Sequence, residues 1–121
     1  MIAELIILNV CHFAGDYTHL SRPWMLAAKK NGTPLLPILA HASVHGVLMA
    51  IAIGAMCGAW FGLLTFAIQV PTHFAIDVAK GRLNTMGGDV ANPASYWHWW
   101  AFGGDQFLHQ LVIILIAYIV S

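Results

Sequence analysis

The strongest constraint on the fold is a histidine and a carboxylate, four residues apart, inside an apolar stretch. His73 and Asp77 lie within residues 70–80, where most of the other side chains are apolar. On a helix, this spacing places both side chains on one face, about 6 Å apart along the axis. Each group is costly to bury in hydrocarbon, so the pair predicts polar partners inside a helical bundle.

The same spacing recurs in the other three hydrophobic segments. The further pairs are His12 with Asp16, His41 with His45, and Asp105 with His109. A single pair has a simple structural interpretation, because an intramembrane histidine often only hydrogen bonds a neighbouring helix, for about 0.6 kcal/mol. Four pairs, one in each predicted helix, instead favour a shared polar cluster with a function.

The composition places the chain among membrane proteins. Of its 121 residues, 60% are hydrophobic and 8% are charged, whereas roughly 25% are charged in a typical soluble domain. The formal net charge is zero, which gives no reason to expect a nucleic-acid partner. Cys11 and Cys57 lack the spacing of a metal knuckle or a redox motif, so we expect free thiols.

We predict an all-α, polytopic membrane protein with four transmembrane helices and a short interfacial helix between the first two. The predicted spans of this single domain, residues 1–121, are about 2–18, 35–56, 60–79 and 97–120. The first segment is expected to be a retained helix, because Glu4 stands where a signal peptide would carry basic residues.

Local signals predict how the helices begin, bend and end. Ser21 is the expected N-cap of the interfacial helix, and Gly32 the expected stop. Pro71 removes a backbone hydrogen bond and is expected to kink the third long helix. Residues 81–95 are rich in Gly, Asn and Pro and lack a helical period, which predicts a loop.

The basic residues predict the orientation of the chain. All five lie in or beside the first and third connectors: Arg22, Lys29, Lys30, Lys80 and Arg82. The positive-inside rule places those connectors in the cytoplasm, so we expect a protein of the bacterial inner membrane with both termini in the periplasm. The eight paired residues then lie at a similar depth, near the cytoplasmic boundary.

The eight paired side chains are candidate ligands of a metal ion. They are His12, Asp16, His41, His45, His73, Asp77, Asp105 and His109. Imidazole and carboxylate donors without thiolate suit a divalent transition metal, with Zn²⁺ expected first and Mn²⁺ or Fe²⁺ as alternatives. Eight donors suffice for two ions, or for one ion with supporting groups and a general base.

This donor set favours hydrolysis as the chemistry, with Asp16, Asp77 and Asp105 as candidate catalytic residues. An ion with an open coordination position generates hydroxide near neutral pH, which is the nucleophile of many hydrolases. A site beneath the headgroups suits a lipid or another amphiphile, and the five basic residues suit its anionic group. Membrane lipids, an amphiphilic substrate and a further copy of the chain are the expected partners.

Two other functions remain open at this point. The chain is alternatively a non-enzymatic membrane or phage accessory module, whose polar cluster only fixes helix packing. Clustered histidines and aspartates also form proton relays, so transport of protons or metal ions is a third interpretation. Asp77 could also pair with Lys80 one turn away, as a surface ion pair of little consequence.

The motifs resemble those of a family of small bacterial and phage inner-membrane proteins known mainly as a domain of unknown function. The motifs are His12-Phe13-Ala14-Gly15-Asp16, Trp24 with Lys29, His41-Ala42-x-x-His45, His73-Phe74-Ala75-Ile76-Asp77 and Asp105-Gln106-x-x-His109. They cover nearly the whole chain. The His-x-x-x-Asp elements are more distantly similar to LexA-regulated membrane-bound proteins labelled metal-dependent hydrolases. Neither resemblance implies a particular substrate.

Overall fold

The computed structural model describes all 121 residues and contains five α-helices and no strand. The helices are α1 (Ile2–Tyr17), α2 (Pro23–Asn31), α3 (Leu35–Cys57), α4 (Ala59–Thr85) and α5 (Tyr96–Val120). The all-α prediction is therefore confirmed, and the short helix α2 lies in the predicted place between the first two long segments.

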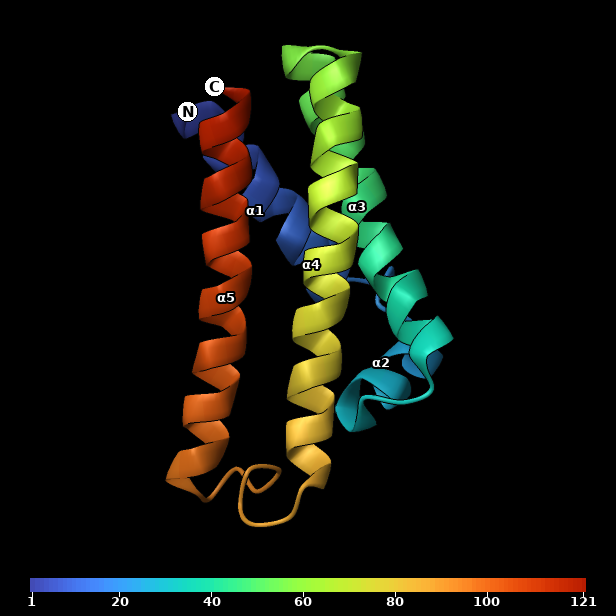
Figure 1. Cartoon of the computed structure of the whole chain (residues 1–121), viewed down its shortest axis with the longest axis vertical. Coiled ribbons are helices and arrows are strands. Elements are labelled where there is room, and N and C mark those ends of the chain that lie inside the picture. Colours follow the sequence, from blue (N-terminus) through green and yellow to red (C-terminus); the bar gives the residue numbers. More distant parts are fainter.

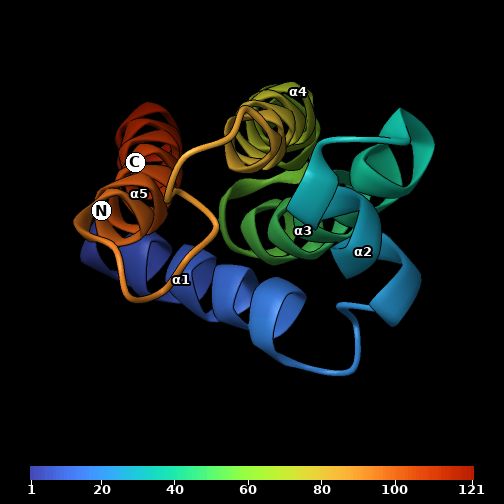
Figure 2. The ribbon, with the colours of Figure 1, turned by 90° about the horizontal axis from the view of Figure 1, so that it is seen from below.

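The three longest helices run alternately up and down, with α4 between α3 and α5 (Figure 1). Helix α1 crosses them obliquely and packs against α3 and α5 (Figure 2). Helix α2 packs on α3 and α4 at the end of the bundle opposite the two chain termini (Figure 1). Helix α2 thus lies beside α3 and α4 and away from α5 (Figure 2).

Three helices, not four, are long and apolar enough to cross a membrane. They are α3, α4 and α5, with 23, 27 and 25 residues. Helix α1 has 16 residues, which corresponds to about 24 Å, against a hydrocarbon core of about 30 Å. The predicted fourth transmembrane helix is therefore not confirmed, because α1 is too short to span this core upright.

Burial is inverted relative to a water-soluble fold. Large apolar side chains such as Ile2, Leu36 and Trp60 are exposed, whereas His41 and Asp77 have no exposed surface. A soluble protein rarely exposes large contiguous apolar surface, and it rarely buries charged groups. The three candidate spans and this burial pattern together indicate an integral membrane protein.

The interior has two layers along the bundle axis. Toward the chain termini, α1, α3 and α5 contribute an apolar cluster that includes Leu8, Met49, Ile53, Ile113 and Ile116. Toward α2, the same helices and α4 contribute buried histidines and aspartates instead. The polar layer therefore lies between an apolar core and the short helix α2.

The observed helix ends differ from the predicted ones in α2 and α4. Helix α4 continues to Thr85, six residues beyond the predicted end at 79. It also remains helical through Pro71, where the Thr72 hydroxyl donates a hydrogen bond to the carbonyl of Ile68 at 2.7 Å. Helix α2 has Arg22 rather than the predicted Ser21 as its N-cap residue.

Two glycines allow α2 to dock closely on α4. Gly32 ends α2 in the left-handed conformation, with φ 72°, and a Cβ there would lie 2.6 Å from the backbone nitrogen of Arg82. A Cβ on Gly81 would in turn collide with the backbone of Lys29 and Gly32. Gly81, within the predicted loop, is therefore a close-approach position inside a helix.

We predict that Gly81→Ala destabilises the protein by about 1–3 kcal/mol, because backbone atoms of α2 have to move to accept the methyl group. Thermal unfolding in detergent measures the change. The matched control is Gly103→Ala on α5, where an added Cβ has no atom within 4 Å. Equal stability of the two variants would contradict the close docking of α2 on α4.

Candidate metal centre

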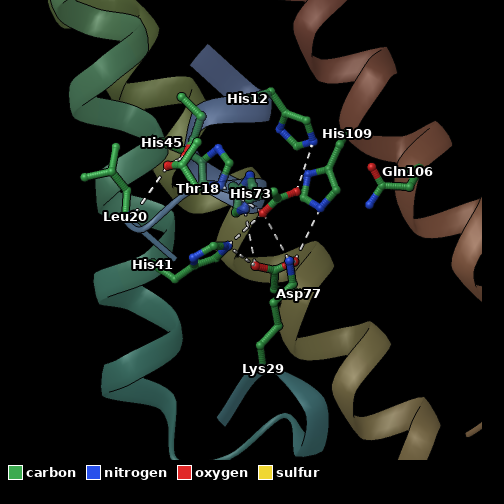
Figure 3. A network of polar contacts seen from close by, with 12 residues as sticks. His12, Thr18, Leu20, Lys29, His41, His45, His73, Asp77, Gln106 and His109 are labelled. Carbon is green, nitrogen blue, oxygen red and sulfur yellow. Dashed lines mark hydrogen bonds and ion pairs between the residues drawn. The ribbon is translucent and has the colours of Figure 1, made fainter. Parts of the chain in front are cut away.

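Four helices bring all eight predicted side chains into one cluster. Figure 3 shows the imidazoles of His12, His41, His45, His73 and His109 gathered together, with Asp77 and Lys29 below them. Each i, i+4 pair projects from a single helix, with one pair on each of α1, α3, α4 and α5. The predicted convergence of the pairs is observed, whereas the predicted roles of these residues as ligands or catalysts stay predictions.

The pairs meet at one level because of where they lie in their helices. His41 lies six residues after the start of α3, Asp77 eight before the end of α4, and Asp105 nine after the start of α5. At 1.5 Å per residue, these positions are about 9, 12 and 14 Å from the same end of the bundle. Because the helices alternate in direction, these three residues lie at a similar depth in the bundle.

Asp16 is the centre of one half of the cluster. Its Oδ1 lies 3.0 Å from Nε2 of His41 and 3.1 Å from Nε2 of His45. Its Oδ2 lies 3.3 Å from Nε2 of His12, one turn earlier on α1. One carboxylate thus faces imidazoles from two different helices.

Asp77 is the centre of the other half and is completely buried. Its Oδ2 lies 3.3 Å from Nε2 of His73, and its Oδ1 lies 3.3 Å from Nε2 of His109. Nε2 of His109 is also 3.4 Å from Oδ1 of Asp105. His109 therefore lies between two carboxylates.

Lys29 joins the two halves from outside the four long helices. Its Nζ lies 3.4 Å from Oδ1 of Asp16 and 3.3 Å from Oδ1 of Asp77. Burial by itself lowers the pKa of Lys29, but the charges of Asp77, Asp16 and Asp105 outweigh it and hold the pKa above its ordinary value. Lys29 therefore enters the cluster as a cation.

The alternative pairing of Asp77 with Lys80 is wrong. Lys80 donates instead to Oδ1 of Asn84, at 3.1 Å, and the cation that contacts Asp77 is Lys29. Asp77 is thus part of a buried network rather than of a surface ion pair.

The spacing between donor atoms suits ligands of a common ion. Two ligands bound to one tetrahedral Zn²⁺ at about 2.0–2.1 Å are about 3.3 Å apart, from the bond lengths and the tetrahedral angle. The donor pairs around Asp16 and Asp77 lie at 3.0–3.3 Å, and the two shortest, from His41 and His45 to Asp16, are hydrogen bonds. Three groups have donor atoms that all lie within 4.8 Å of one another: Asp16, His41, His45 and His73; His12, His73 and His109; and Asp77, Asp105 and His109.

Several of these close approaches are not hydrogen bonds. Nε2 of His73, Nε2 of His109 and both oxygens of Asp77 are buried and lack a hydrogen-bond partner, although the two nitrogens lie 3.3 Å from the carboxylate. Buried polar atoms without partners are rare in native proteins, and each calls for an explanation such as a bound ion. Nitrogen and oxygen atoms that approach closely without hydrogen-bond geometry form an arrangement that a cation between them would stabilise.

The formal charge of the cluster points the same way. Three aspartates contribute −3 and Lys29 contributes +1, which leaves −2 when the imidazoles are neutral. Uncompensated charge in a low-dielectric interior is strongly unfavourable. One divalent cation, or two protonated imidazoles, would neutralise the cluster.

Gln69 supports His73 from the side opposite the cluster. Its amide nitrogen lies 3.1 Å from Nδ1 of His73, while its Oε1 is buried without a partner. Because amide N and O are assigned from their surroundings, the rotated amide would accept a hydrogen bond from Nδ1–H. Nε2 of His73 would then present its lone pair to the cluster. In known metal sites, outer partners of this kind fix the tautomer and the orientation of the histidine ring.

From sequence alone, packing and support of a ligand are equally good interpretations of Gln69, and Lys29 is not placed in the cluster. Gln69 lies four residues before His73, and that spacing is a usable signal for a partner on the same helix face. No comparable signal exists for Lys29, because its placement depends on how α2 folds back onto α4.

An all-α bundle with three candidate spans and a buried layer of histidines and aspartates defines a helical, membrane-type protein with a candidate metal centre. The chain belongs to the family described as Protein of unknown function (DUF3307), whose model matches residues 4–121. No curated protein and no solved structure matches it. The resemblance to a domain of unknown function is thus confirmed, whereas the comparisons give no support for a bacterial or phage source or for the LexA-regulated group.

We predict that Lys29→Met lowers the stability of the metal-free protein by about 3 kcal/mol, because it removes the only lysine that contacts the buried carboxylates. Zn²⁺ should restore most of the loss by supplying the missing positive charge. Unfolding in detergent with EDTA and then with Zn²⁺ measures both effects.

Lys30→Met is the matched control for this experiment, because Lys30 neighbours Lys29 but forms no ion pair. Its stability should stay near that of the unaltered protein. If Zn²⁺ leaves the Lys29→Met variant as unstable as EDTA does, protonated histidines rather than a metal neutralise the cluster.

Proposed function

We propose that this protein is a metal-dependent hydrolase of the bacterial inner membrane, acting on a lipid or another amphiphile. The observation that carries the proposal is a buried cluster of eight nitrogen and oxygen donors with a formal charge of −2, next to an open pocket. The pocket is lined by Asp16 and Asp105 of the cluster, so a ligand in it would contact the candidate centre.

The orientation that we propose follows the basic residues and the docked helix. Helix α2 and the 86–95 connector lie at one end of the bundle, and both chain termini at the other (Figure 1). By the positive-inside rule, we propose that the basic end faces the cytoplasm and the termini face the periplasm. Helix α1 is proposed as a fourth, tilted membrane segment, whose polar end at Asp16 stops within the protein interior.

A bound divalent ion, with Zn²⁺ as the first candidate, would polarise the scissile bond and lower the pKa of a bound water. The histidines and Asp77 would hold it, and Lys29 would offset negative charge that develops on the substrate. Asp105, which borders both the cluster and the pocket, is placed to accept a proton from the attacking water. The water oxygen bonds to the electrophilic atom, the bond to the leaving alcohol breaks, and that alcohol takes up the proton.

A purely structural role explains fewer of the observations. Side chains that only fix helix packing should satisfy one another by hydrogen bonds, whereas the 3.3 Å contacts of Asp77 with Lys29, His73 and His109 lack hydrogen-bond geometry. Transport is disfavoured by the apolar layer of Leu8, Met49, Ile53 and Ile113, which lies between the cluster and the terminal end of the bundle. A single copy therefore offers no continuous polar path.

We predict that the purified protein contains a stoichiometric divalent transition metal, and that His41→Ala and Asp77→Ala each reduce its metal content at least tenfold. Each substitution removes a donor from the centre of the cluster. Elemental analysis of detergent-purified protein measures the ratio. His98→Ala is the control, since His98 contacts the carbonyl of Val90 instead. Metal-free wild-type protein of unchanged stability would refute the metal centre.

We further predict that Asp105→Asn retains the metal but lowers hydrolysis about 10²–10⁴-fold, the contribution expected of a general base. Release of p-nitrophenol from long-chain p-nitrophenyl esters and phosphoesters in micelles measures the rate. Asp89→Asn, in the exposed connector, is the matched control and should leave the rate unchanged. A metal-loaded protein that cleaves no probe would leave the ion with a structural role.

A further inference from the structure

The pocket beside the cluster has a basic rim that the proposed chemistry does not use. It measures about 270 Å³ and is formed by residues of α1, α2, α4 and α5. Its buried side includes Asp16, Asp105 and Lys29, and its outer side includes Lys30 and Lys80. Any ligand that reaches the cluster through this pocket passes two ammonium groups.

These two rim lysines have no carboxylate partner. All ion pairs of lysine in the structure involve Lys29. Lys80 is held at the rim by a hydrogen bond of 3.1 Å to Oδ1 of Asn84, and Nδ2 of Asn84 donates at 3.1 Å to the carbonyl of Lys30. The rim thus carries two ammonium groups without a counter-ion from the protein, and the one on Lys80 is held by Asn84.

The charge at this end of the bundle selects the class of ligand. The cluster sums to −2, and one divalent ion brings it to zero. Lys30 and Lys80 then add +2 at the rim. A phosphate monoester carries about −1.5 to −2 charges at neutral pH and accepts several strong hydrogen bonds, so it complements this rim.

A second, apolar pocket adjoins the first and lies between α4 and α5. It measures about 250 Å³, shares Lys80 and Asp105 with the polar pocket, and is otherwise lined mainly by Ile76, Ala79, Leu83, Ala101 and Leu108. Its small residues leave a groove between the two helices. A polar pocket beside an apolar groove, with two lining residues in common, has the form expected for an amphiphile.

We propose that the two pockets bind one membrane lipid with a phosphate headgroup, the phosphate at Lys30 and Lys80 and the hydrocarbon chain in the α4–α5 groove. This inference rests on the function proposed above and names its substrate class. The lipid would present the bond next to its phosphate to Asp105, because that residue lines both pockets.

The test uses oleylphosphonate, which has one chain, an anionic headgroup and no ester bond to hydrolyse. Native mass spectrometry of the full-length protein in detergent counts the bound probe over a concentration series, with and without Zn²⁺. Lys80→Gln and Ala79→Leu should each weaken binding about tenfold or more, by removing a rim charge and by filling the groove.

Two matched controls accompany these variants. Arg82→Gln removes an exposed charge two residues from Lys80, and Ala67→Leu adds the same side chain at an exposed position of α4 outside the groove. Both should bind the probe as the unaltered protein does. Oleyl alcohol and inorganic phosphate, which each offer half of the lipid, should not displace the probe at equal concentration.

The outcomes separate the two proposals. Loss of binding in Lys80→Gln but not in Ala79→Leu would indicate a soluble phosphate compound and overturn the lipid assignment. Equal binding by all four variants would overturn the site itself. Because the probe contains no scissile ester, its binding is scored whether or not the protein hydrolyses anything. Failure of the hydrolase proposal therefore appears in metal content and esterase rate, not in this experiment.

Discussion

Burial of two carboxylates in the same layer of the interior is the constraint on which the rest of the structure depends. Asp16 and Asp77 are almost or completely removed from solvent, and water cannot stabilise their charge. Five imidazoles and the ammonium group of Lys29 surround these carboxylates instead. Replacing one partner would leave a buried charge unmatched, which typically costs 3–5 kcal/mol. The cluster therefore fixes the axial positions of its four helices relative to one another.

That register imposes demands on backbone packing. Imidazoles and carboxylates from four helices reach one another only where helices approach closely, and several of the close approaches outside α5 lie at glycines. A Cβ on Gly15 would lie 2.5 Å from the ring of His45, so the ring of one helix packs directly on the backbone of another. Gly32 and Gly81 do the same for α2 and α4 and thereby bring Lys29 to both carboxylates. The contacts among the buried charged groups therefore depend on the glycines at these close approaches.

The i, i+4 spacing was sufficient to predict the helices and the convergence of their polar faces, because both follow from helical periodicity and alternating direction. The position of Lys29 could not be predicted, since it results from contact between α2 and α4, fifty residues apart. The same contact explains the error at Gly81: a glycine that suggests a loop in the sequence is needed here for close packing within a helix. The short length of α1 was visible in the sequence, but four similar pairs favoured four equivalent spans.

The two-layer interior bears on which chemistry the cluster can support. The apolar layer near the termini closes the bundle on one side, whereas the polar layer is bordered on the other side by a pocket with three lysines. A conduit needs polar groups on both sides of its narrowest point, but a catalyst needs only one way in. Access from one side, donors without hydrogen-bond partners, and an adjoining apolar groove favour a reaction on a membrane-embedded substrate over the passage of ions. Lys29, Lys30 and Lys80 lie on this accessible side, in the lining of the same pocket.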